Sequence, residues 1–164
     1  FSPERQKAWI TRRVDAEKRS ITLPPQRDHI LRRWIILNEK AVGWPACGNA
    51  LAHWPGETLL LAPSTLAGVA TPGFSVQHYD PEKLRIGDEE LEELIQLARH
   101  HRPQLFLLLD ENPSLPLLYL AAKSGADYRV GFSGRDEYPF FNLSINSKSP
   151  SEWGALLTRW LEPI

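Results

Sequence analysis

The chain has 164 residues, a formal net charge of -1 and 42% hydrophobic residues, a composition typical of one globular domain. This near-neutral total gives no electrostatic reason to expect a nucleic-acid partner. We expect no membrane span and no secretory signal, because apolar runs such as 105–109 are far shorter than the roughly 20 residues that cross a bilayer. The single cysteine, Cys47, excludes an internal disulfide and favours a cytoplasmic location.

Residues 1–24 are expected to form a basic helical arm in front of the main domain. Pro3 stands where a first helical residue is expected, and Trp9, Ile10 and Val14 provide an apolar stripe. A pair of prolines then ends the helix.

Charge is distributed unevenly along the chain. Residues 1–33 hold nine Lys or Arg and four Asp or Glu, so this part carries +5 and the remainder -6. Such an arm can bind an anionic membrane surface. The alternative, which we favour, is an arm packed on its own domain, on a protein partner or on a second copy, because its apolar stripe needs cover. The arm lacks aromatic residues interleaved for base stacking, so no nucleic-acid partner is expected.

From residue 28 onward, predicted strands and helices alternate. Their hydrophobic periodicity distinguishes the two kinds of element. The predicted strands are 30–37, 57–62, 74–79, 105–109, 128–132 and 141–145. The predicted helices are 45–54, 88–102, 115–123 and a last one that carries Trp153 and Trp160. This alternation predicts a single Rossmann-like α/β domain over 28–164, with an open, mostly parallel sheet and helices on both faces.

Local signals support two of these elements. The helix 88–102 has acids in its first turn and bases in its last, which is the order that the helix dipole favours. The last helix opens with Ser-Pro-Ser-Glu at 149–152, the sequence of a capping box.

Polar residues follow the predicted strands. In open parallel sheets ligands bind outside the carboxyl ends of the strands, so these residues are the candidates for a ligand crevice. The candidates are Asn38, Glu39 and Lys40 after the first strand, Ser64 and Thr65 after the second, Asp110, Glu111 and Asn112 after the fourth, and Ser133 and Arg135 after the fifth. The alternative is simple turn chemistry, because loops are polar anyway and Asn112 and Ser114 are natural helix caps.

No cofactor or metal site is predicted. Gly43 and Gly48 have the spacing of P-loop glycines, but Asn49 and Ala50 follow where that loop needs Lys and Ser or Thr. The sequence has no G-x-G-x-x-G and no G-x-S-x-G motif. Of the five histidines, two are adjacent on a helix, where neighbouring side chains point about 100° apart, and the others are scattered.

Short motifs carry a resemblance to a known family. A hydrophobic strand, the loop Val42-Gly43-Trp44, and Pro55-Gly56-Glu57 before the next strand follow one another. This order resembles the start of glycosyltransferase family 9, the ADP-heptose:lipopolysaccharide heptosyltransferases, whose loop reads Ile-Gly-Asp. Gly125-Ala126 and Arg129–Phe132 are similar to the Gly-Ala and Arg-Ile-Gly-Phe of that family. Small stand-alone bacterial domains of unknown function, with a basic helical arm in front, resemble the chain at least as well.

The resemblance covers about residues 30–146 and implies a function by analogy. Family enzymes have two domains, of which the first holds the acceptor and the acid of the loop, and the second binds the nucleotide-sugar. Trp44 stands at the position of the acid, and an indole cannot take a proton from an acceptor hydroxyl. We therefore expect no catalytic residue, no second domain, and a Trp44 that covers the crevice or meets a partner.

Two functions follow as expectations. The first is a non-catalytic, glycosyltransferase-like domain that binds a small molecule or a partner protein. The alternative is the acceptor-binding half of a glycosyltransferase that works with a separate nucleotide-sugar-binding subunit.

Overall fold

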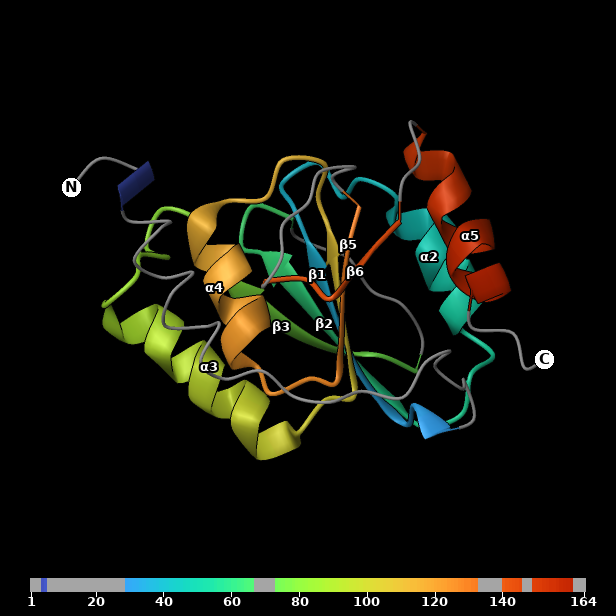
Figure 1. The fold of residues 1–164 in the computed structure, drawn as a ribbon, viewed down its shortest axis with the longest axis horizontal. Coiled ribbons are helices and arrows are strands. Elements are labelled where there is room, and N and C mark those ends of the chain that lie inside the picture. The colour runs from blue at the N-terminus through green and yellow to red at the C-terminus, as the bar shows by residue number, and fades with distance from the viewer. Residues whose placement is uncertain (1–3, 6–28, 67–72, 133–139, 146–148, 161–164) are drawn as a thin grey trace.

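A computed structural model describes residues 4–5, 29–66, 73–132, 140–145 and 149–160, in which strands and helices alternate as predicted (Figure 1). In chain order the elements are β1 (Arg32–Leu37), α2 (Trp44–Leu51), β2 (Glu57–Pro63), β3 (Ser75–Tyr79), α3 (Glu89–His101), β4 (Leu105–Leu109), α4 (Leu115–Lys123), β5 (Tyr128–Gly131), β6 (Leu143–Ser144), a 3-10 turn (Pro150–Glu152) and α5 (Trp153–Trp160). Most of the predicted arm, 1–24, lies outside the described residues. None of the described helices has the length and apolar character of a membrane span.

The described strands form one six-stranded sheet in the order β3-β2-β1-β4-β5-β6. Every neighbouring pair is parallel, which confirms the predicted open α/β sheet. Ile35 in β1 lies in register with Leu60 in β2 and Leu107 in β4, and all three side chains are fully buried. The apolar residues of these strands therefore form the centre of the domain, as their sequence predicts.

Helices cover both faces of the sheet, because the chain leaves its centre in opposite directions. From β1 the chain proceeds to β2 and β3 at one edge, and from β4 it proceeds to β5 and β6 at the other. Right-handed crossovers then place α2 on one face and α4 on the opposite face. Figure 1 shows α3 and α4 together on one side of the sheet and α2 and α5 on the other.

Alternate residues of β1 supply the two cores. Trp34 and Ile36 pack in the cluster that contains α3 and α4, whereas Ile35 and Leu37 pack in the cluster with α2 and α5. The period of two along a strand accounts for this division. Arg33 lies in the same strand and is only 2% exposed, although arginine side chains are seldom so deeply buried.

The side chain of Arg33 is held inside the protein by neutral acceptors. Its Nε donates to Thr58 Oγ1 at 3.0 Å, and its Nη1 donates to the carbonyls of Ile30 and Pro55 at 2.8 and 2.7 Å. The guanidinium also lies over the ring of Trp54, 5.7 Å from its centroid. Burial lowers the pKa of Arg33. Its hydrogen bonds join the start of β1 to the start of β2, so this cation has a structural role.

Helix α5 packs closely on α2. Trp153 is fully buried and stacks on Phe132 with ring centroids 4.5 Å apart, as expected for the apolar stripe of this helix. A Cβ atom at Gly154 would lie 2.4 Å from the carbonyl oxygen of Ala46, so the two helices approach through their backbones. The predicted burial of the Trp160 side chain lies outside what the structure describes.

The start of the last helix differs from the predicted capping box. Ser149 makes no side-chain cap hydrogen bond, and its hydroxyl lies 2.7 Å from that of Ser151 instead. Pro150–Glu152 form a 3-10 turn, which winds the backbone more tightly than an α-helix.

Candidate functional site

A crevice opens at the carboxyl ends of β1 and β4, with a volume of about 520 Å³. This is the position where the strand order reverses and where open α/β sheets bind ligands. Its polar lining consists of Asn38, Glu39, Lys40, Asp110, Glu111, Asn112 and Ser114. Its apolar lining consists of Val42, Tyr79, Pro81, Leu84 and Leu117. The volume falls within the range of small-molecule pockets, roughly 300 to 1,000 Å³.

The structure brings together six of the residues that the sequence nominated. Those after the first strand and those after the fourth share the crevice because β1 and β4 are neighbours in the sheet. Ser64 and Thr65 are exposed at the end of β2 and do not line it. Ser133 and Arg135 lie outside the described residues.

Turns closed by side chains shape the strand exits. Asn38 Oδ1 accepts hydrogen bonds from the N–H groups of Lys40 and Val42, each at 3.1 Å. Asp110 Oδ1 accepts one from the N–H of Asn112 at 2.9 Å. Each of these residues thus fixes the turn that follows it, in the manner of an Asx-turn. The turn interpretation of the joint after β4 therefore holds for one oxygen of Asp110.

The predicted helix caps at this joint are not formed as expected. Ser114 occupies the cap position of α4, but its hydroxyl makes no capping hydrogen bond. A cap side chain bonds to the N–H of the second or third helical residue, and the second here is Pro116, which has none. Ser114 lines the crevice.

Tyr79 lies at the floor of the crevice and was missed in the sequence. Its hydroxyl donates to the carbonyl of Leu37 at 2.7 Å, which ties the end of β3 to the end of β1. Burial raises the pKa of this phenol, and the negative charges of Asp110 and Glu39 raise it further. Tyr79 is therefore a neutral donor. It is the one buried residue of β3, which is a signal that sequence alone does not provide.

Trp44 does not cover the crevice. It begins α2, is 9% exposed, and packs in the core cluster beneath that helix. Its ring centroid lies 5.8 Å from that of Phe74, and Gly48 leaves room for the indole. The side chain is buried because α2 requires an apolar residue in its first turn to pack on the sheet.

Gly43 precedes Trp44 and sets the path of this loop. Its φ of 72° is left-handed, a conformation that glycine adopts readily. A Cβ at this position would lie 2.4 Å from Cε3 of Trp153. The loop after β1 therefore depends on glycine for two separate reasons.

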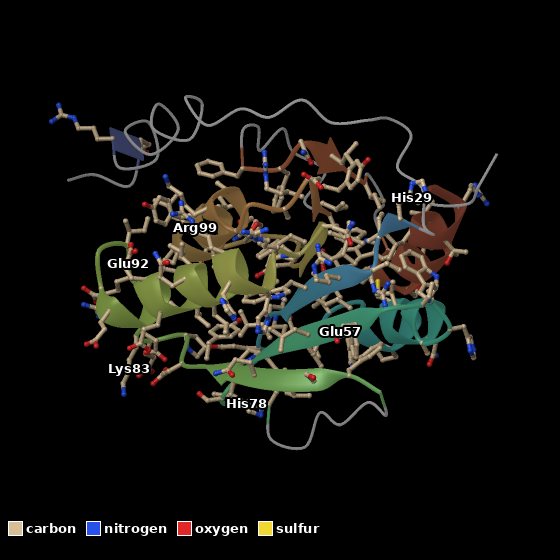
Figure 2. All side chains as sticks on the ribbon, turned by 90° about the horizontal axis from the view of Figure 1, so that it is seen from below. His29, Glu57, His78, Lys83, Glu92 and Arg99 are labelled. Carbon is tan, nitrogen blue, oxygen red and sulfur yellow. The ribbon has the colours of Figure 1, made fainter. Side chains whose placement is uncertain are left out.

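Metal and nucleophile chemistry find no support in the described part of the chain. Within those residues, no group of three His, Cys, Asp or Glu side chains is arranged to hold a metal ion. Figure 2 shows His78 on the edge strand β3 and His29 at a distance from it, before β1. Cys47 is buried, and desolvation raises the pKa of its thiol to about 12, so it stays protonated at neutral pH.

The fold and the crevice together define a Rossmann-like α/β domain with a polar crevice at its topological switch point. Comparisons with protein-family models, with curated proteins and with solved structures returned no match.

Proposed function

We propose that the chain is a non-catalytic, glycosyltransferase-like binding module whose crevice takes a small hydroxyl-rich ligand. The observation that carries this proposal is the convergence of two strand exits on one polar crevice. Glu39, Asp110 and Glu111 accept hydrogen bonds from hydroxyls, and Lys40 and the amide of Asn112 donate them. Three carboxylates against one lysine disfavour a ligand that is itself anionic.

The replacement of the base that the resembled family uses supports a binding role over the chemistry of that family. In the resemblance to glycosyltransferase family 9, the base belongs to the loop at Trp44, which is buried away from the crevice. Asp110 uses one carboxylate oxygen to close its turn. Tyr79 stays protonated, and its hydroxyl donates a hydrogen bond to the carbonyl of Leu37. Glu39, Glu111 and the second oxygen of Asp110 remain as acceptors for the hydroxyls of a ligand, which is the role that the proposal gives them.

The alternative is the acceptor-binding half of a glycosyltransferase that works with a separate nucleotide-sugar-binding subunit. The position of the crevice favours it, because hydroxyl-rich acceptors belong to the first domain of the enzymes that the sequence resembles. A cytoplasmic location, suited to the single cysteine, is part of both proposals. Both proposals also include a protein partner or a second copy of the chain that binds the arm, 1–24.

Calorimetry with free sugars, oligosaccharides and ADP-sugars tests the proposal on the wild type, Asp110→Asn and Asp110→Ala. Asparagine keeps the turn-closing oxygen and removes the charge, whereas alanine removes both. We expect free sugars to bind, both variants to bind them more weakly, and ADP-sugars to show neither tight binding nor transfer. Micromolar binding of an ADP-sugar, or sugar transfer that disappears in Asp110→Ala, contradicts the proposal.

A mixing experiment separates the two functions. The chain is combined with a separately produced nucleotide-sugar-binding domain, and transfer is measured with each component alone as the control. Transfer in the mixture only, and its loss with Asp110→Asn, establishes the half-enzyme. Continued inactivity with demonstrated sugar binding favours the binding module.

A further inference from the structure

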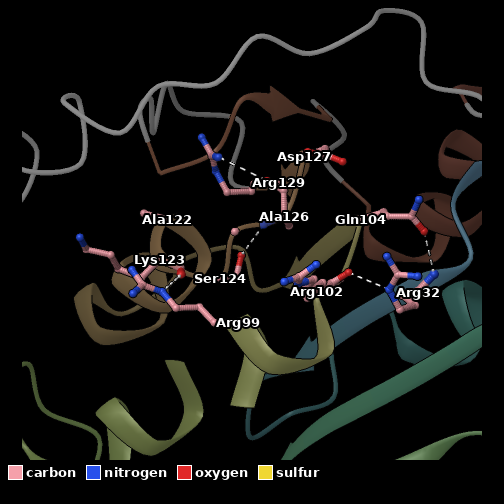
Figure 3. A pocket seen from close by; sticks show the side chains of 12 residues that line it. Arg32, Arg99, Arg102, Gln104, Ala122, Lys123, Ser124, Ala126, Asp127 and Arg129 are labelled. Carbon is pink, nitrogen blue, oxygen red and sulfur yellow. Dashed lines mark hydrogen bonds between the residues drawn. The ribbon is translucent and has the colours of Figure 1, made fainter. Parts of the chain in front are cut away.

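A second concave site lies at the opposite end of the sheet from the crevice, where the strands β1, β4 and β5 begin. It has a volume of about 830 Å³ and lies among the starts of β1, β4 and β5 and the ends of α3 and α4 (Figure 3). We call it the basic groove, because five cations line it, namely Arg32, Arg99, Arg102, Lys123 and Arg129. Of the lining residues that the structure describes, Asp127 is the one carboxylate.

Hydrogen bonds hold the floor of the groove in place. The side chain of Gln104 accepts from the N–H groups of Leu31 and Arg32 at 2.7 and 3.1 Å, and it donates to the carbonyl of His29 at 2.5 Å. The hydroxyl of Ser124 donates to the carbonyl of Ala121 at 2.7 Å and accepts from the N–H of Ala126 at 3.2 Å. The groove is therefore built on fixed backbone rather than on a loose loop.

The guanidinium groups of the groove differ from that of buried Arg33. Arg33 has three protein acceptors, whereas Arg32 and Arg99 each donate once, through Nε, to the carbonyls of Arg102 and Lys123. Within the described residues, the guanidinium of Arg102 makes no hydrogen bond. In the same part of the chain, no carboxylate forms an ion pair with Arg32, Arg99 or Arg102. These donors are left for solvent or a ligand.

The helix dipoles do not account for this charge. Arg99 and Arg102 lie at the end of α3 and Lys123 at the end of α4, where cations are favourable. Each helix end is equivalent to about -0.5 charge, so two ends offset about one unit. Arg32, Arg99 and Arg102, which have no ion-pair partner within the described residues, carry three positive charges. The two helix ends therefore offset only about one of these three charges.

We propose that the basic groove binds a small soluble molecule that carries two or more phosphate groups. One guanidinium group can bind two oxygens of a phosphate at once. Several guanidinium groups close together therefore match a ligand with several phosphates. None of the described residues that line the groove is aromatic, so this lining offers no platform on which nucleobases stack. Among the described lining residues the apolar ones are Pro103 and two alanines, which is too little for an acyl chain or for the apolar anchors of a peptide.

Calorimetry with inorganic tripolyphosphate tests this proposal on the full chain at moderate salt. Citrate serves as the carboxylate probe, and a short DNA duplex and anionic vesicles represent the macromolecular alternatives. We expect tripolyphosphate to bind in the micromolar range, and Arg99→Gln and Arg102→Gln each to weaken it roughly tenfold. The matched control is Arg85→Gln, which changes an exposed arginine beside the start of α3 and should leave binding unchanged.

Each other outcome overturns the proposal. These are the absence of binding up to millimolar tripolyphosphate, equal binding of citrate, preference for the duplex or the vesicles, and equal weakening by Arg85→Gln. Melting temperatures verify that the variants are folded, and Arg99→Lys, which keeps charge without the planar fork, serves if a glutamine variant is not. Asp110→Asn, at the crevice, should leave tripolyphosphate binding intact, so this proposal and the proposed function fail or succeed separately.

Discussion

The two ends of the sheet hold opposite charges and are built in different ways. At the carboxyl end, three carboxylates and one lysine surround the crevice, and strand exits closed by their own side chains form its rim. At the amino end, the described lining of the basic groove has five cations and one carboxylate, and the amide of Gln104 joins the start of β4 to the segment that leads into β1. The ligands that we propose for the two hollows therefore differ in charge.

The comparison shows that polarity at the end of a strand is insufficient to define a ligand. In the crevice, part of the polar chemistry is consumed by the turns, because the oxygens of Asn38 and Asp110 bind backbone N–H groups. In the groove, backbone carbonyls take only part of the donor capacity of Arg32 and Arg99. The donors that the fold leaves unused are therefore the better guide to a ligand.

The largest expected effect concerns the glycine that supports the crevice. Gly43→Ala should lower the free energy of unfolding by roughly 2–4 kcal/mol, since it adds a left-handed non-glycine residue and an overlap with Trp153. Gly87→Ala is the matched control, because Gly87 has a φ of 91° with no atom near its Cβ position. Urea denaturation should show a loss of only about 1–2 kcal/mol for Gly87→Ala. Equal losses would mean that packing against Trp153 does not support the loop.

The floor of the basic groove is held by the hydrogen bonds of a side chain, whereas the loop beside the crevice is held by packing against Trp153. Gln104→Ala removes three bonds to the segment before and at the start of β1 and should cost about 2–3 kcal/mol. Gln96→Ala, at an exposed position of α3, should change stability by less than ~0.5 kcal/mol. Urea denaturation compares the two, and tripolyphosphate binding should weaken only in Gln104→Ala. Unchanged stability in Gln104→Ala would contradict this role for the amide.

The hydroxyl of Tyr79 should make the stability of the crevice end of the sheet depend on pH. Tyr79→Phe leaves the carbonyl of Leu37 without its donor and should cost about 1–2 kcal/mol at neutral pH. The folded protein raises the pKa of Tyr79 above its ordinary value of 10.0, so it holds this proton more tightly than the unfolded chain does. The stabilisation that this proton provides is complete below pH 10.0 and is lost as pH rises above it.

Denaturation midpoints measured from pH 8 to pH 12 should therefore decrease less steeply in Tyr79→Phe than in the wild type. Tyr119→Phe is the control, because Tyr119 lies on α4 and only part of its surface is buried. Parallel pH profiles for the wild type and Tyr79→Phe would show that the phenol does not retain its proton.

The smallest expected effect distinguishes two roles of Asp110, which are to close its turn and to contact a ligand. Asp110→Ala removes the acceptor for the N–H of Asn112 and should cost about 1 kcal/mol, whereas Asp110→Asn should cost less than ~0.5 kcal/mol. Thermal denaturation measures both, and binding of free sugars should weaken in both variants. If only alanine weakens binding, the turn alone matters and the charge of Asp110 does not contact the ligand.

Local patterns in the sequence determined most of the elements and their order. The apolar stretch Leu105–Leu109 is β4, and the segment Leu115–Lys123 is α4, with the bounds that were predicted. Periodicity and turn residues suffice for this, because they depend on neighbours within a few positions. They also located the strand exits, and six of the nominated residues do share one crevice.

Only the tertiary structure decided what these residues meet. Arg32 and Arg33 are adjacent, yet one lines the basic groove and the other is buried, because successive side chains of a strand point to opposite faces. Trp44 entered the core although its loop adjoins the crevice. Gln104 reaches Arg32 across 72 positions of sequence, and Tyr79 reaches Leu37 across 42. Such contacts follow from strand order, which depends on how the whole chain closes and is not encoded in any short window.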